Sequence, residues 1–201
     1  MNKTLDEIAL EHGTDKASKH QHKGHNYCVH YARFFDALRD QPIKFLEIGV
    51  GGGESMRAWL EFFPSATIYG VDIVHDTNPW NTKDSGLDRY IYTEGDQSSE
   101  AFWKEFIDQK LGQWDVIIDD GGHYANQVQT SIQCLWPHIK PGGLYCIEDL
   151  ACSYSEIFLP AGSEPPIEML KRKVDEINQA GEIECAFFSK ELAILKKAAS
   201  V

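Results

Sequence analysis

The sequence predicts an α/β protein in which a mainly parallel sheet is covered by helices on both faces. Short apolar segments with strand patterns alternate with helical segments from about residue 43 onward, which is typical of a parallel sheet. The first of these strands ends in a run of glycines, as strand-to-helix turns beside ligands often do. The last two strands are joined by a tight turn, so a terminal hairpin adds an antiparallel strand.

The elements follow in order from apolar periodicity and from start and stop signals. The expected strands are Ile43 to Ile48, Thr67 to Val71, Tyr90 to Thr93, Trp114 to Ile118, Leu144 to Ile147, Ile183 to Phe188 and Glu191 to Lys196. The expected helices are Glu54 to Phe63, one beginning at Ser98, Asn126 to His138, and Pro165 to Ala180. We expect turns at residues 141–143 and 189–190, and the long loops 75–88 and 152–166 suit a lid or an acceptor-binding role.

About forty residues precede this pattern and differ from it in character. Two helical segments are expected there, Leu5 to Glu11 and Tyr27 to Leu38, with a loop between them. We therefore expect residues 1–40 to form an N-terminal helical extension or lid, and residues 41–201 to form one domain. The region is rich in histidines, which fit a solvated loop, a lid or an adventitious metal site: His12, His20, His22, His25 and His30.

The composition is that of a globular protein with an excess of acid. The chain has 201 residues, of which 42% are hydrophobic, and 19 basic against 31 acidic side chains give a net charge of −12. This charge disfavours binding to nucleic acid or to an anionic membrane. We expect no membrane-spanning helix and no secretory signal. The five cysteines contain no C-x-x-C pair, so we expect reduced thiols and a cytoplasmic location.

Three strand ends predict a nucleoside site. The first strand runs into Gly49, Gly51, Gly52 and Gly53, and Glu54 stands where a dinucleotide fingerprint would carry Gly or Ala. A carboxylate there disfavours a pyrophosphate and suits a cationic ligand such as S-adenosylmethionine (SAM). Polar residues at the next two strand ends complete the site: Asp72, which can accept ribose hydroxyls, and Asp96 with Gln97, which can bind an adenine amino group. Asp96 could instead cap the following helix.

Paired acids follow the fourth and fifth strands. These are Asp119 with Asp120, and Glu148 with Asp149. If the two strands are parallel neighbours, four carboxylates meet at one edge, and a hard divalent cation such as Mg²⁺, Mn²⁺ or Ca²⁺ relieves their repulsion. His123 lies close enough to act as a general base on a hydroxyl. The alternative is structural: Asp119 supports the nucleoside site, the second pair caps the next segment, and His123 is a hydrogen-bonded loop residue.

These segments resemble a known family. Phe45 to Gly51 with Asp72, Gly95-Asp96 and Asp119-Asp120 resembles a class I SAM-dependent methyltransferase. Three further motifs are similar to metal-dependent sugar and macrolide O-methyltransferases, including cephalosporin-hydroxylase-like proteins: Gly13 to Lys16, Asp119 to His123, and Ile147 to Asp149. The resemblance implies a Rossmann-like sheet of order 3-2-1-4-5-7-6 with strand 7 antiparallel. The larger macrolide enzymes carry an N-terminal auxiliary domain, where this chain has about forty residues.

The resemblance also implies roles for individual residues. It implies that His123 is the general base and that Asp120, Glu148 and Asp149 hold Mg²⁺. It places these residues around SAM: Thr14, Lys16, Glu47, Gly49, Gly51, Asp72, Asp96, Gln97 and Asp119. Tyr27 and Tyr31 could help to close the pocket.

The sequence therefore predicts a Mg²⁺- and SAM-dependent O-methyltransferase. The acceptor is a small hydroxylated molecule, a sugar or a glycosylated natural product, and neither nucleic acid nor membrane is an expected partner. A homo-oligomer remains open. Two alternatives are a metal-independent small-molecule methyltransferase and a non-catalytic SAM- or nucleoside-binding module. An NAD-dependent oxidoreductase is disfavoured by Glu54.

Overall fold

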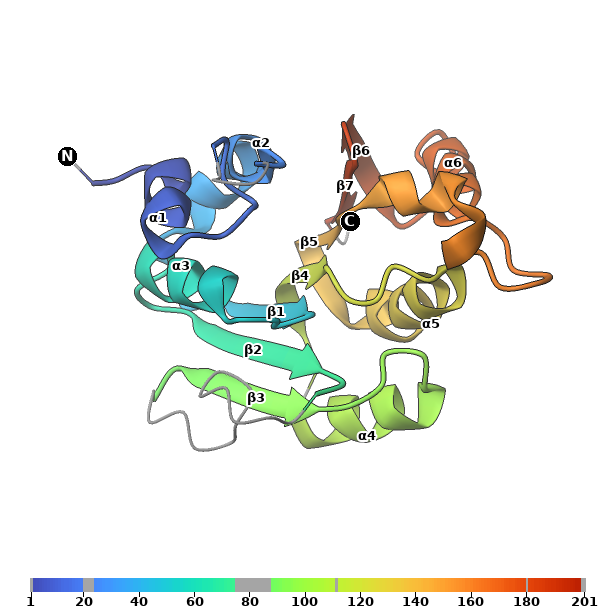
Figure 1. Ribbon diagram of the computed structural model, residues 1–201, viewed down its shortest axis with the longest axis horizontal. Helices are drawn as coiled ribbons and strands as arrows, with labels where there is room; N and C mark the ends of the chain where they lie inside the picture. The colour runs from blue at the N-terminus through green and yellow to red at the C-terminus, as the bar shows by residue number, and fades with distance from the viewer. Residues whose placement is uncertain (1, 20–23, 75–87, 111, 180, 200–201) are drawn as a thin grey trace. The chain divides into compact units, whose positions relative to one another are not determined.

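A computed structural model describes residues 2–19, 24–74, 88–110, 112–179 and 181–199 (Figure 1). Its strands are β1 (Lys44–Ile48), β2 (Thr67–Asp72), β3 (Tyr90–Glu94), β4 (Trp114–Asp119), β5 (Ile139–Ile147), β6 (Ile183–Ser189) and β7 (Leu192–Lys197). Its α-helices are α1 (Leu5–His12), α2 (Tyr27–Phe35), α3 (Glu54–Phe62), α4 (Glu100–Lys110), α5 (Ala125–Leu135) and α6 (Pro166–Glu176). Short 3-10 helices are η1 (Asp36–Leu38), η3 (Trp136–His138), η4 (Leu150–Tyr154) and η5 (Glu156–Phe158).

The strands form one sheet of order β3-β2-β1-β4-β5-β7-β6, which confirms the predicted topology. β2 pairs with β3 and β4 with β5 in parallel, whereas β7 runs antiparallel to β5 and β6. The terminal hairpin is therefore confirmed. The parallel pairing of β4 with β5 also meets the condition on which the argument from four carboxylates depends.

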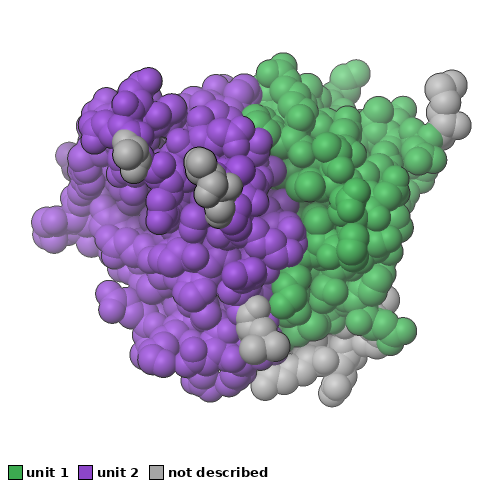
Figure 2. Space-filling model, turned by 180° about the vertical axis from the view of Figure 1, so that it is seen from behind, with its two compact units in different colours: residues 1–45, 50–94 green, residues 46–49, 95–201 purple. Residues whose placement is uncertain are grey.

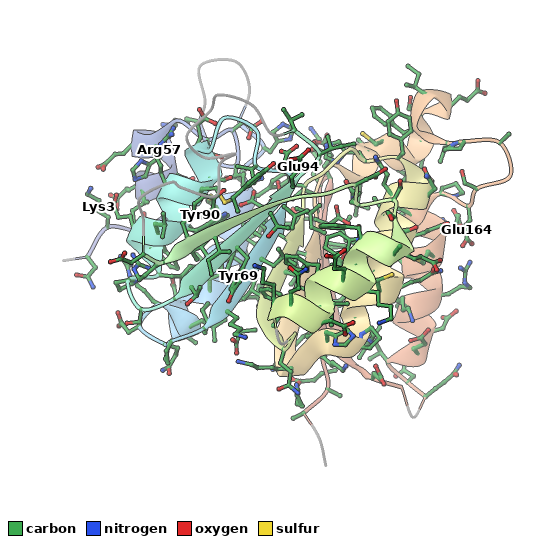
Figure 3. All side chains as sticks on the ribbon, turned by 90° about the horizontal axis from the view of Figure 1, so that it is seen from below. Lys3, Arg57, Tyr69, Tyr90, Glu94 and Glu164 are labelled. Carbon is green, nitrogen blue, oxygen red and sulfur yellow. The ribbon has the colours of Figure 1, made fainter. Side chains whose placement is uncertain are left out.

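The chain divides into two compact units, coloured in Figure 2. Unit 1 comprises Met1–Phe45 and Val50–Glu94, and unit 2 comprises Leu46–Gly49 and Gly95–Val201. Figure 3 labels Tyr69 and Tyr90, which come from the paired strands β2 and β3 of unit 1. Each unit has its own aromatic core.

Unit 1 is built around four aromatic rings. Phe35, Phe45, Trp59 and Phe63 pack with ring centroids between 5.1 and 6.4 Å apart. Tyr31 stacks on Phe35 at 4.8 Å and is fully buried. The rings come from α2, β1, α3 and the residue after α3, so their burial joins helices to the sheet. Tyr27 is also buried, and with Tyr31 it serves the core of unit 1.

Local sequence signals account for the ends of α1. The backbone N–H of Glu7 donates to Thr4 Oγ1 at 3.2 Å, and the Thr4 N–H donates to Glu7 Oε2 at 2.8 Å. This reciprocal pair satisfies donors that the first turn of a helix leaves open. Gly13 ends the helix with φ of 75°, a conformation that glycine adopts without steric cost. The helix then buries Leu5, Ile8 and Ala9.

Unit 2 has a second aromatic cluster between α4 and β4. Phe106 of α4 stacks on Trp114 of β4 at 5.8 Å, and Trp103 meets Phe106 edge-on at 5.7 Å. The indole N–H of Trp103 donates to the Gln97 carbonyl at 2.8 Å. This hydrogen bond connects the core to the segment that carries predicted site residues.

Several boundaries differ from those predicted. β5 begins at Ile139 and includes residues 141–143, which we expected to be a turn. The strand begins earlier because Ile139 already pairs with Trp114 of β4. The register then shifts before Leu144 pairs with Val116, and this irregularity accommodates Gly142 at φ of 78°.

Two further boundaries were also wrong. The hairpin turn lies at residues 190–191 instead of 189–190, with Glu191 at φ of 64°. The helix predicted to reach His138 ends at Leu135 and continues as η3, because Pro137 has no N–H to donate.

Two predicted features fall wholly or partly outside the described residues. Residues 75–87 of the long loop lie there, as do His20 and His22 of the histidine-rich segment. Within the described residues, no helix combines the length and the apolar character that crossing a bilayer requires.

Candidate functional site

In unit 1 the glycine turn is tied to Asp72. Asp72 ends β2, and its Oδ2 accepts hydrogen bonds from the N–H groups of Val50 at 2.8 Å and Gly51 at 3.1 Å. Its Oδ1 accepts from the Val74 N–H at 3.2 Å. Gly51 has φ of 51°. Each carboxylate oxygen has two lone pairs, so Asp72 can hold the turn and still accept a ligand hydroxyl.

Thr14 and Lys16 are buried in unit 1, with 5% and 2% of their surfaces exposed. They lie just after the end of α1. The Lys16 N–H donates to Thr14 Oγ1 at 3.3 Å, and the Lys16 carbonyl accepts from the N–H of Cys28 in α2 at 3.0 Å. The segment is therefore a fixed connection between two helices, and a lysine so well buried needs an anionic or strongly polar neighbour.

In unit 2, Gln97 joins three parts of the predicted site. Its Nε2 donates to Asp119 Oδ1 at 3.0 Å and to Ser131 Oγ of α5 at 3.2 Å, and its Oε1 accepts from the Gly122 N–H at 2.8 Å. Gln97 is 6% exposed. These contacts use both amide protons, so the side chain holds the end of β4 against the loop that carries His123.

Asp119 ends β4 and is 2% exposed. The pKa of its carboxyl is raised to about 7, mainly by burial and to a lesser degree by the neighbouring Asp120 charge, while hydrogen bonds from Gln97, Gly121 and Tyr145 oppose the rise. The Tyr145 hydroxyl donates to Asp119 Oδ2 at 3.3 Å. Burial and the Asp119 carboxylate also raise the pKa of Tyr145 well above its usual range. Asp119 is thus a buried acid whose charge depends on its surroundings.

The pair Gly121-Gly122 packs closely against two glutamine side chains. A Cβ on Gly121 would lie 1.8 Å from Gln97 Oε1, and one on Gly122 would lie 2.3 Å from Gln127 Oε1. The side-chain amides of Gln97 and Gln127 therefore occupy the space that larger residues would need. This packing fixes the loop immediately before His123.

His123, Asp149 and Asp120 form the chemical centre of unit 2. One ligand atom from each lies within 4.8 Å of the others, and His123 Nε2 is 3.5 Å from Asp149 Oδ2. His123 and Asp149 have φ of 60° and 53°, a costly conformation for residues other than glycine. Backbone strain of this kind is concentrated at functional sites.

Sheet pairing brings the end of β4, with Asp120, next to the end of β5, with Glu148, although the cluster of ligand atoms includes Asp120 and not Glu148. Asp119 is in register with Ile147, and the Glu148 N–H donates to the Asp119 carbonyl at 3.0 Å. The Asp120 N–H donates to the carbonyl of Ile48 at 2.9 Å. Glu148 is 3% exposed, whereas Asp120 is half-buried. The acids predicted from the two strand ends therefore follow adjacent strands, as expected.

Asp120 and Asp149 fit a single hard cation. Two oxygens of one octahedral Mg²⁺ lie about 3 Å apart, and Mg²⁺ keeps several of its waters. The carboxylate oxygens lie within 4.8 Å of each other, so small side-chain rotations suffice. His123 belongs to the same cluster, and its nitrogen can serve as a ligand or as a base.

The other predicted residues of unit 2 have structural settings that the sequence left open. Asp96 Oδ1 accepts from the Ser98 N–H at 2.8 Å and the Ser98 hydroxyl at 2.7 Å, so it stabilises the turn before α4. Glu47 is fully buried near the end of β1. Gly49 has φ of 88°, and a Cβ there would lie 2.0 Å from the Asp120 carbonyl oxygen.

Sequence reasoning missed three participants. Tyr145 and Ser131 hold Asp119 and Gln97, and Phe158 lies 6.5 Å from His123 between ring centroids. Tyr145 could have been found, because a tyrosine within the apolar strand before Glu148 is a local signal. Nothing in the local sequence indicates that Phe158, thirty-five residues after His123, returns to it.

Comparisons with known proteins identify the family of the chain. Residues 46–150 match the family described as a methyltransferase domain. The chain belongs to this family. A solved MycE methyltransferase from the mycinamycin biosynthetic pathway, in complex with Mg and SAH, superposes with a TM-score of 0.82 and 31% identity over 99% of this chain and 56% of that one. The predicted resemblance and fold class are thereby confirmed.

Two curated relatives of the chain are O-methyltransferases by name. Mycinamicin VI 2''-O-methyltransferase of Micromonospora griseorubida is 41% identical over 65% of this chain and 33% of its own length. The 8-demethyl-8-alpha-L-rhamnosyl tetracenomycin-C 2'-O-methyltransferase of Streptomyces olivaceus is 35% identical over 86% of this chain and 45% of its own length. The chain thus spans less than half the length of these relatives.

Proposed function

We propose that this methyltransferase domain transfers a methyl group from SAM to a hydroxyl of a sugar or glycosylated natural product, with Mg²⁺ as the metal. The observation that carries the proposal is the cluster of Asp120, His123 and Asp149 within 4.8 Å. Relatives named as O-methyltransferases, one of them of a rhamnosyl compound, support the acceptor class. A bound Mg²⁺ makes a coordinated hydroxyl more acidic, and bound SAM supplies the methyl group.

His123 acts as the general base in this proposal. Its Nε2 takes the hydroxyl proton of the acceptor, and Asp149 Oδ2, 3.5 Å away, stabilises the imidazolium that results. Asp120 and Asp149, with Glu148 beside them, hold the metal. Asp119 and Gln97 fix the loop that positions His123, so the base needs little reorganisation during the reaction.

For the cofactor we propose the residues that the family resemblance implies: Thr14, Lys16, Glu47, Gly49, Gly51, Asp72, Asp96, Gln97 and Asp119. Within unit 1, the carboxylate of Asp72, which accepts from the N–H groups of Val50 and Gly51, suits the ribose hydroxyls. We also propose that residues 1–40 serve as a helical extension or lid to a domain of residues 41–201, and the packing of α1 and α2 within unit 1 supports an ordered extension. A cytoplasmic enzyme without nucleic-acid partners fits the charge of −12.

A methyl-transfer assay tests the proposal. Purified protein is incubated with SAM and a panel of sugar and phenol glycosides, with Mg²⁺ or with EDTA, and product is followed by mass spectrometry. We expect turnover of a sugar hydroxyl that EDTA abolishes. His123→Ala should reduce turnover at least 100-fold, in line with the loss of a general base, while SAM binding measured by calorimetry stays nearly unchanged. Full activity in EDTA, or in His123→Ala, contradicts the proposal.

A further inference from the structure

Aromatic side chains stand beside the His123–Asp149 pair in unit 2. The Phe158 ring lies 6.5 Å from the His123 ring, at 70° to it, and 5.3 Å from the Tyr124 ring. Tyr124 directly follows His123, whereas Phe158 ends η5 in the segment after β5. Two segments far apart in the sequence therefore meet at the proposed base.

Tyr124 and the short helices η4 and η5, the second of which ends at Phe158, expose large apolar side chains. Tyr124 is 40% exposed, and Tyr154 and Ile157, which belong to η4 and η5 with Phe158 close by in sequence, are each 74% exposed. Aromatic and aliphatic side chains left in water beside convergent polar groups are typical of small-molecule sites. The polar groups here are the nitrogen of His123 and the carboxylates of Asp120 and Asp149.

We propose that Tyr124 and Phe158 form the acceptor-binding surface, and that they pack against an apolar face of the acceptor while its hydroxyl lies at His123 Nε2. This inference rests on the proposed function and adds the residues that select the substrate. A pyranose has polar hydroxyl edges and a face of C–H groups, which suits the negative face of an aromatic ring. Phe158 has no polar atom, so it favours a deoxygenated sugar or an apolar aglycone over a fully hydroxylated sugar.

Phe158 is the residue on which the inference can be tested. The variants are Phe158→Ala and Phe158→Leu, because leucine retains apolar volume without the ring. Phe188→Ala provides the matched control, since Phe188 is an aromatic residue of β6 with 39% exposure. Thermal melts verify that each variant folds. The probes are 4-nitrophenyl α-L-rhamnopyranoside and methyl α-L-rhamnopyranoside, which differ only in the apolar group.

The primary measurement is sugar binding by saturation-transfer NMR in the presence of SAH and Mg²⁺. We expect the nitrophenyl glycoside to bind the wild-type protein more tightly than the methyl glycoside. Phe158→Ala should weaken nitrophenyl glycoside binding at least tenfold, Phe158→Leu less, and Phe188→Ala not at all. SAM affinity should stay within twofold. Where a glycoside is turned over, Phe158→Ala should raise KM and leave kcat within threefold.

Other outcomes overturn the inference. Unchanged glycoside binding in a folded Phe158→Ala protein removes Phe158 from the acceptor surface. A lower kcat with unchanged KM instead assigns Phe158 to the orientation of His123. Failure of the proposed function would give a different result. If glycoside binding depends on Phe158 but no hydroxyl is methylated, the acceptor surface is supported and the methyl-transfer reaction is contradicted.

Discussion

At the scale of single residues, the site of unit 2 combines strain with burial. His123 and Asp149 hold left-handed backbone conformations, and Asp119 is a carboxyl group with almost no contact with solvent. Neither feature favours folding. Both are maintained by neighbours such as Gln97, whose amide holds Asp119 and the loop before His123. These costs can be measured by substitution.

The backbone strain at His123 predicts an unusual order of stability. At φ of 60°, alanine keeps the steric cost of a Cβ and glycine removes it, so His123→Gly should be about 1 kcal/mol more stable than His123→Ala. Urea unfolding measures the difference. At Asp108 within α4, the same pair of substitutions should show the reverse order, because glycine weakens an ordinary helix. Equal stability of the two His123 variants would contradict the prediction.

The raised pKa of Asp119 predicts a pH-dependent stability. The unfolded carboxyl titrates near its ordinary pKa of 3.8, and burial raises the folded value to about 7. Between these values the folded state binds the proton more tightly, so this group makes the protein less stable as pH rises from 4 to 7. One pKa unit corresponds to about 1.4 kcal/mol, which allows an effect of a few kcal/mol.

Asp119→Asn isolates this contribution. Urea unfolding in EDTA from pH 4.5 to 7.5 should show the variant gaining stability relative to the wild-type protein as pH rises. Asp108→Asn, at a largely exposed position, serves as the control and should give a nearly constant difference. A pH-independent difference for Asp119→Asn would mean that the carboxyl is not destabilised by burial.

At the scale of elements, turns and loops between strands and helices carry the chemistry. β4 and β5 bring their acids side by side, and the loop from β4 to α5 must pass close to the end of β1. Gly49 permits this approach, since only a residue without Cβ fits against the Asp120 carbonyl. The glycine turn therefore serves packing in unit 2 as well as any ligand.

Two glycines of the same turn should respond differently to substitution. Gly49→Ala places a Cβ 2.0 Å from the Asp120 oxygen, whereas Gly51→Ala meets nothing within 4 Å. Gly51→Ala should cost about 1 kcal/mol from its positive φ alone, and Gly49→Ala should cost more than about 3 kcal/mol because backbone must move. Urea unfolding of both variants tests this. Similar losses of stability in the two variants would mean that the loop carrying Asp120 moves aside at little cost.

At the scale of the whole molecule, the net charge of −12 is the global property most directly tied to ligand binding. Part of this charge is concentrated in unit 2, where Asp120 and Asp149 approach each other around His123. A divalent cation that binds the folded state and not the unfolded state stabilises the protein by mass action. General screening of surface charge by salt must be separated from this effect.

Mg²⁺ should therefore raise the melting temperature beyond the effect of NaCl at equal ionic strength. At one hundred times its Kd, a ligand adds about 2.7 kcal/mol. Asp149→Asn should remove the specific increase, and asparagine tolerates the left-handed conformation of this position. Asp175→Asn, an exposed acid of α6, should retain it. Equal responses of the two variants would indicate charge screening instead of a site.

Most of the fold could be predicted because its signals are local. The apolar run of β4, the glycines after β1 and the acids after β4 and β5 are contiguous in the sequence. The order of the strands in the sheet was implied by the resemblance to class I methyltransferases, because the local pattern alone does not say which strands are neighbours. The start of β5 at Ile139 could not be predicted, because residues 141–143 look like a turn until their pairing with β4 is known.

The sequence by itself determined the α/β class and the paired acids and histidine at the strand ends, because strand periodicity and strand-end residues are local features of the chain. Its motifs also resemble those of methyltransferases, which implied the activity. Only the tertiary structure decided which groups meet. In the folded chain Gln97 donates to Asp119 and Ser131, Asp149 lies beside His123, and the Phe158 ring lies near the same histidine. Such contacts join residues far apart in the chain, so they depend on packing and not on local pattern.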